Sequence, residues 1–126
     1  MKMQQSLVSV NEGMSQLRLS GSLSEWLFSS GFWSDFNVKH GTMFDPFEED
    51  EANVPIVEAI IEALCKRVCD LEKEDKFNVE FVYRWTLEQK PVTTSVPRVL
   101  LLSEIATFRD FLVIAVAKNH CVTFTL

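Results

Sequence analysis

The chain has 126 residues, of which 47% are apolar and 24% are charged, and its 18 acidic and 12 basic residues give a net charge of −6. A chain of this length normally forms one domain of roughly 100–200 residues, with a core that needs no disulfides. We therefore expect residues 1–126 to form a single domain. The length excludes a barrel enzyme and a complete dinucleotide-binding domain, and the negative charge argues against a general nucleic-acid-binding protein.

The N-terminus and the cysteines favour a cytoplasmic protein. Polar residues at positions 4–6 interrupt the apolar core that a signal peptide needs. The longest apolar run, 111–117, is far shorter than the roughly 20 residues of a membrane span. The chain contains three cysteines, and an odd number without a secretory signal is typical of reduced thiols. We expect a cytoplasmic protein that does not contact membranes.

The first predicted elements are a hairpin and a short helix. Leu7–Val10 and the alternating residues around 17–19 predict two strands, joined across a turn at Asn11–Gly13. Ser22 and Glu25 have the spacing of a capping box, which predicts that a short helix begins there. The following stretch, rich in aromatic and loop residues, is expected to be irregular, with a short strand at 36–40.

The clearest helix is predicted from about Pro55 to Lys73. Asn53 is a suitable N-cap, and proline fits the first turn of a helix because its missing N–H would be unpaired there. Apolar residues recur at spacings of three and four and predict one buried stripe, formed by Val57, Ile60, Ile61, Leu64, Val68 and Leu71.

The C-terminal half is expected to be rich in strands. Phe77–Thr86 alternates between apolar and polar residues, so its odd-numbered residues, Trp85 included, are expected to face a core. A polar connection at 88–96 and a buried strand at Arg98–Leu102 follow. The β-branched content of 111–117 favours a hairpin with 120–126 over the alternative, a helix continuing from Ser103.

Together these elements predict an α+β fold. We expect an antiparallel, possibly mixed, β-sheet with one long helix and one or two short helices packed on it.

Residues that could carry catalysis or bind a metal are few. Cys65 and Cys69 share one face of the long helix, but zinc needs further ligands, and no second paired cluster accompanies them. The pair is better explained by buried cysteines that act as small apolar residues of the helix. His40 and His120 lie outside any metal-binding or catalytic motif, and there is no nucleophile elbow or phosphate-binding loop. We expect no catalytic residue, metal or cofactor.

The acidic segment Asp45–Glu51 is the strongest candidate for a functional site. It holds five acids in seven residues and no base, so charge repulsion predicts an extended, solvated loop. Aromatic residues lie close to it in sequence, and rings with a charged rim are typical of binding hot spots. The alternatives are that the acids stabilise the following helix N-terminus and that the rings complete the core. The candidate partner-binding residues are Trp33, Asp35, Phe44, Asp45, Phe47, Glu48, Glu49, Asp50 and Glu51.

A small acidic domain with an acidic loop and no catalytic set is expected to bind another protein. In its length, its acidity and its DPFEEDE segment, the chain resembles the small immunity proteins of bacterial toxin–immunity pairs, such as those of contact-dependent growth inhibition. The resemblance implies that it neutralises one cognate toxin by binding at or near the active site. A basic nuclease would suit the acidic loop, which can occupy a phosphate-binding groove.

Two other functions remain open from the sequence. One is a secretion chaperone, which would dimerise and wrap an unfolded effector segment. The other is a phage-encoded inhibitor of a host defence nuclease, which would use the same charge complementarity. In all three cases the partner is a protein rather than a nucleic acid, and the sequence leaves the oligomeric state undetermined.

Overall fold

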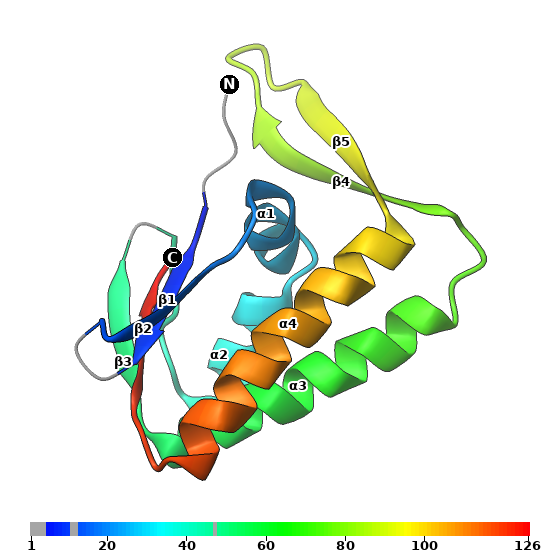
Figure 1. The fold of residues 1–126 in the computed structure, drawn as a ribbon. Coiled ribbons are helices and arrows are strands. Elements are labelled where there is room, and N and C mark those ends of the chain that lie inside the picture. The colour runs from blue at the N-terminus through cyan, green and yellow to red at the C-terminus, as the bar shows by residue number, and fades with distance from the viewer. Residues whose placement is uncertain (1–4, 11–12, 47) are drawn as a thin grey trace.

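The computed structural model describes residues 5–10, 13–46 and 48–126 (Figure 1). Within these ranges the chain forms helices and exclusively antiparallel strand pairs, so the predicted α+β class is confirmed. The helices are α1 (Gly21–Ser29), α2 (Phe32–His40), α3 (Val54–Glu72) and α4 (Arg98–Ala117). The strands are β1 (Leu7–Val10), β2 (Ser15–Arg18), β3 (Glu49–Ala52), β4 (Asn78–Trp85), β5 (Pro91–Pro97) and β6 (Val122–Thr125).

The strands form two sheets rather than one. Four of them pair in the order β2-β1-β6-β3, while β4 and β5 form a separate hairpin that projects from the body of the molecule (Figure 1). The predicted N-terminal hairpin of β1 and β2 is confirmed. The C-terminal strand β6 lies between β1 and β3, so the two ends of the described chain meet in the middle of the sheet.

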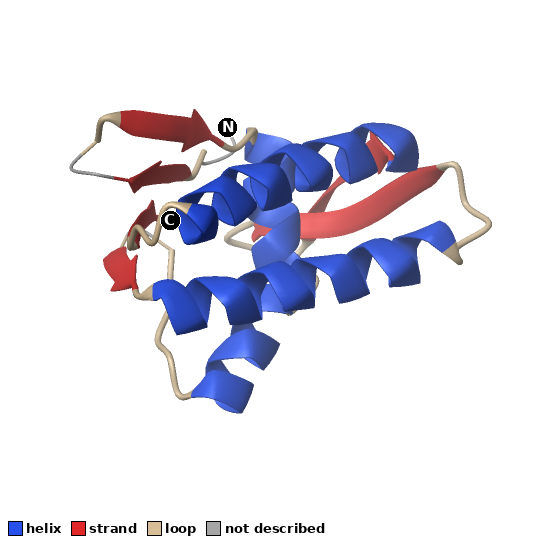
Figure 2. Ribbon diagram, turned by 60° about the horizontal axis from the view of Figure 1, so that its bottom comes forward, coloured by secondary structure: helices blue, strands red, loops and turns tan. Residues whose placement is uncertain are grey.

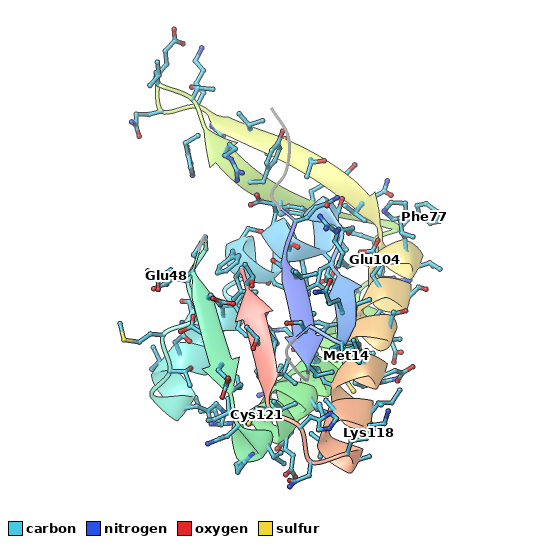
Figure 3. The ribbon with its side chains drawn as sticks, turned by 60° about the vertical axis from the view of Figure 1, so that its left-hand side comes forward. Met14, Glu48, Phe77, Glu104, Lys118 and Cys121 are labelled. Carbon is cyan, nitrogen blue, oxygen red and sulfur yellow. The ribbon has the colours of Figure 1, made fainter. Side chains whose placement is uncertain are left out.

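Helices cover one face of the four-stranded sheet. The two long helices, α3 and α4, run side by side and pack against each other (Figure 2). The predicted start of the long helix is confirmed, because the Asn53 side chain accepts a hydrogen bond from the Ile56 N–H at 3.2 Å. The opposite face of the sheet is covered by no described element (Figure 3).

A cluster of aromatic rings fills the space between the sheet and the helices. Trp33 is 1% exposed, and its ring centroid lies 5.0 Å from those of Phe32 and Phe44 and 5.9 Å from that of Phe124. Phe108 of α4 reaches the same cluster through Phe124, at 6.4 Å. These rings bring α2, α4, β6 and the loop before β3 together in one core.

The prediction for the segment after α1 was wrong. An irregular stretch with a strand at 36–40 was expected, but the segment forms the helix α2. In a helix, Phe32, Trp33 and Phe36 lie on the same side and are all buried in the core. Gly31, with φ +80°, permits the sharp turn between α1 and α2.

The start of α1 also lies two residues earlier than predicted. Ser20, not Ser22, is the N-cap, and its hydroxyl accepts a hydrogen bond from the Leu23 N–H at 3.1 Å. Glu25 forms an ion pair with Arg84 of β4, at 2.8 Å. The predicted capping box is therefore wrong.

The largest error concerns the C-terminal third. The predicted strands at 98–102 and 111–117 form one helix, α4, because Leu101, Ile105, Phe108, Leu112 and Ala115 recur at helical spacing and are buried. Tertiary packing here overrides the β-propensity of the branched residues. The segment predicted as a polar connection, 88–96, instead contains most of β5.

The predicted core face of β4 holds only in its first half. Val79 and Phe81 are buried, but Trp85 is 63% exposed and Phe77 before the strand is also exposed. The register shifts between Val82 and Arg84, so the alternation is broken there. The expectation that Trp85 faces the core was wrong.

We predict that Trp33→Ala and Trp85→Ala affect stability very differently. Trp33→Ala should lower the free energy of unfolding by about 3–5 kcal/mol, because it leaves a cavity in the aromatic cluster. Trp85→Ala should change it by less than about 1 kcal/mol, as for other exposed side chains. Urea unfolding measures both, and a loss of similar size in the two variants would contradict this assignment of core and surface.

Candidate functional site

The acidic segment forms the edge strand β3 and the turn before it, and not the extended loop expected from the sequence. β3 pairs with β6, with Asp50 opposite Phe124 and Ala52 opposite Val122. Because side chains alternate across a strand, Asp50 and Ala52 point inward and the glutamates of β3 point to solvent. The prediction that these glutamates are solvated therefore agrees with the structure, although Asp50 is half-buried.

Four exposed acids lie on β3 and in the segment before it, and we call them the acidic edge: Asp45, Glu48, Glu49 and Glu51. Figure 3 shows Glu48 at one border of the sheet, just before β3. The backbone of Glu48 is fixed, because its carbonyl oxygen accepts a hydrogen bond from the Leu126 N–H at 3.0 Å. The backbone of the acidic edge is therefore tied to Leu126 at Glu48.

The acidic edge forms no ion pair with any base in the described part of the chain. The ion pairs found there involve other acids: Asp35 with Arg67, Glu25 with Arg84, Glu88 with Lys90 and Asp110 with Arg109. Across the outer sheet face, Glu49 lies in one row with Thr125, Leu7 and Arg18. Arg18 is three strands away, about 14 Å at the usual strand spacing. The local negative charge is therefore not neutralised within the fold.

The other predicted site residues lie elsewhere. Trp33 and Phe44 are core residues, so they cannot be displayed to a partner, and the part of the prediction that placed them at an interface needs correction. Asp35 lies on α2 and pairs with Arg67 of α3 at 3.1 Å, apart from the acidic edge. Phe47 lies outside the described residues.

Asn37 fixes the turn that directs Phe44 inward. Its side-chain amide donates to the Phe44 carbonyl oxygen at 3.0 Å and accepts from the Phe44 N–H at 2.9 Å, and the Thr42 hydroxyl donates to the same amide oxygen. With the ring locked in the core, the chain emerges at Asp45 and Pro46, both exposed.

Exposed apolar side chains lie near the acidic edge on the β4–β5 hairpin. A small cavity of about 110 Å³ is lined by Pro46 before β3 and by Arg84 at the end of β4, together with Phe28 and Leu126. Beyond Arg84, Trp85 is largely exposed and Leu87 is fully exposed. We call residues 85–90 the hairpin tip. Figure 3 shows the hairpin projecting on the same side of the molecule as Glu48.

Sequence reasoning missed the hairpin tip. The signal that was available is the polar run from Thr86 to Lys90 around Leu87, which marks a turn between two strands. In the structure Gln89 has φ +64° and its N–H donates to the Thr86 carbonyl oxygen, as expected of a tight turn.

The residues considered for metal binding or catalysis are scattered. Cys65 is half-buried, whereas Cys69 and Cys121 are exposed, and all three are free thiols. No group of three or more His, Cys, Asp or Glu side chains is placed to hold a metal ion within the described ranges. The ring of His40 packs on that of Phe36, with centroids 4.4 Å apart. None of the described helices combines the length and the apolar character needed to cross a bilayer.

No protein-family model, curated protein or solved structure matches the chain.

We predict that the Glu25–Arg84 ion pair anchors the hairpin. Glu25 is almost buried on α1 and Arg84 is only partly exposed, so this contact is shielded from water. Arg84→Met should lower the free energy of unfolding by about 1–3 kcal/mol and speed hydrogen exchange in β4 and β5 more than in α3. Lys90→Met is the matched control, because it removes an exposed pair in the same hairpin, at 3.6 Å, whose contribution is small. Equal effects of the two substitutions would argue against an anchoring role.

Proposed function

We propose that the protein is a non-catalytic binding protein that neutralises a basic partner protein, as an immunity protein neutralises a nuclease toxin. The partner would contact the acidic edge and the hairpin tip together. The observation that supports this most directly is the set of exposed carboxylates on β3 and the preceding turn that have no cation partner in the described part of the chain.

Charge and apolar contact would play different parts in such binding. A local excess of negative charge accelerates the encounter with a basic surface and selects against acidic partners. Affinity usually depends on a few buried aromatic or apolar anchors, and exposed Trp85 and Leu87 are side chains of that kind. A nuclease exposes basic groups where it binds phosphate, so an acidic strand placed there would exclude the substrate by charge and by bulk.

A structural role for the acids is the main alternative to a binding role. Charged residues on an edge strand prevent edge-to-edge pairing with other sheets. The other edge of the same sheet, β2, has the sequence SQLR and so carries one charge, whereas β3, with the sequence EDEA, carries three. If one charge suffices at β2, protection of an edge does not require all three acids of β3.

We predict that neutralising the acidic edge weakens partner binding. The partner is first captured from an extract of the encoding organism, and its affinity is then measured with purified components. The triple variant Glu48→Gln, Glu49→Gln and Glu51→Gln should bind at least roughly tenfold more weakly at low salt, and its affinity should depend less on salt than that of the parent. Asp50 is left unchanged because it points inward.

A charge-matched control separates local from overall charge. The triple variant Glu72→Gln, Glu74→Gln and Asp75→Asn removes the same number of exposed negative charges at the C-terminal end of α3. It should bind the partner as the parent does. Equal losses in the two triple variants, or no loss in either, would reject the acidic edge as the interface. A partner that is bound only in an unfolded state, as shown by protease sensitivity, would favour the chaperone function instead.

We predict that Trp85 is an anchor of the interface. Trp85→Ala should weaken binding by about 2 kcal/mol or more, the loss typical of a buried aromatic anchor, while leaving the urea midpoint nearly unchanged. Met14→Ala, which truncates an exposed apolar side chain next to β2 at the opposite edge of the sheet, is the control and should have no effect on binding. Parent-like affinity of the Trp85 variant would exclude the hairpin tip from the interface.

A further inference from the structure

Helix α4 carries a solvent-exposed apolar face in addition to its buried one. Val99, Leu100, Val113 and Ile114 are each between 46% and 67% exposed. At the helical rotation of 100° per residue they fall on one side of the helix, together with Ser103, Thr107 and Asp110. Asp110 is the only charged residue among these seven. In Figure 3 α4 forms one border of the molecule, and no described element lies outside it.

The exposed apolar residues are arranged symmetrically along the helix. They form one pair near each end of α4, and both pairs lie equally far from a midpoint between Ala106 and Thr107. If two copies of α4 packed antiparallel about a two-fold axis at that midpoint, Val99 would lie level with Ile114 of the other copy, and Leu100 level with Val113. The apolar end of one helix would thus meet the apolar end of its symmetry mate, as an isologous interface requires.

The polar centre of this face is self-complementary in the same arrangement. Ser103 and Asp110 are also symmetric about the midpoint, so the hydroxyl of one copy would lie level with the carboxylate of the other and could donate to it. Arg109 lies 3.5 Å from Asp110 in the same chain and offsets its charge. The Thr107 hydroxyl already donates to the Ser103 carbonyl oxygen at 3.2 Å, so it needs no partner near the axis.

We propose that the protein forms a homodimer through antiparallel packing of α4 on α4. Although each chain has a net charge of −6, this face is almost neutral, so charge repulsion is weakest there. An overlap of residues 98–115 spans about 27 Å. A single helix pair is small compared with the roughly 1,200–2,000 Å² buried in stable interfaces, so the dimer should dissociate at micromolar concentrations.

Sedimentation velocity of the full chain between roughly 1 µM and 1 mM tests this proposal. The parent should pass from monomer to dimer with increasing concentration, and a monomer throughout would overturn the proposal. Leu100→Glu or Val113→Lys should each raise the dissociation constant at least about tenfold, because each buries an unpaired charge. Val38→Glu changes an even more exposed apolar residue, on α2, and should leave self-association unchanged.

The antiparallel register has its own test. The double variant L100E/V113K places opposite charges level with each other twice in an antiparallel dimer, but like charges level with each other in a parallel one. It should therefore associate more tightly than either single variant. Association no tighter than that of the single variants would overturn the register, and unchanged association of both single variants would exclude α4 as the interface. Unaltered circular dichroism and urea midpoints confirm folding.

A dimer through α4 does not depend on the proposed function. Dimerisation is also expected of a secretion chaperone, so it does not distinguish the two functions. In Figure 3, α4 and β3 lie at opposite borders of the molecule, so a dimer through α4 leaves both acidic edges open. Leu100→Glu should therefore keep partner binding, and the acidic-edge triple variant should keep dimerisation. Loss of one property without the other shows which of the two proposals has failed.

Discussion

The position of β6 determines which side chains of the neighbouring strands point into the core and which point to solvent. Val122 and Phe124 point inward, and Phe124 contacts the aromatic cluster around Trp33. With these side chains buried, the register of β3 against β6 is fixed, because a slip of one residue would bury the glutamates and expose Ala52. The acidic edge is therefore a consequence of how the core closes at the C-terminus, even though its residues lie some 75 positions earlier in the sequence.

Local sequence patterns were sufficient to predict the elements that have one apolar face and one polar face. The stripe of α3 and its Asn53 cap, and the alternation of β1 and β2, determined their type and approximate bounds. For α4 the same reasoning failed, because the two segments predicted as strands, 98–102 and 111–117, are apolar on nearly all sides. A segment with no polar face shows no period, and β-branched residues then favour a strand. The exposed apolar face of α4 is thus both the reason for the wrong prediction and the basis for the dimer.

The candidate site could be predicted only in its charged part. Five acids in seven residues are visible in the sequence, and repulsion among them predicts their solvation without knowledge of the fold. The hydrophobic part was assigned to the wrong residues, because proximity in sequence says little about which rings reach the core. Trp33 and Phe44 are buried by contacts with Phe124, far along the chain, whereas Trp85 is exposed after a register shift that no local pattern revealed.

The acidic edge also affects stability. Glu48, Glu49 and Glu51 lie within about one Debye length of each other, so their mutual repulsion is only partly screened at physiological salt. Such repulsion opposes the folded state of the free protein, in which these carboxylates are held together on one strand. A basic surface that binds them removes this cost, so binding energy and folding energy are coupled at β3. The same acids that would recognise a partner should therefore make β3 the least stable strand of the sheet in the free protein. Binding of the partner should stabilise β3 against local unfolding.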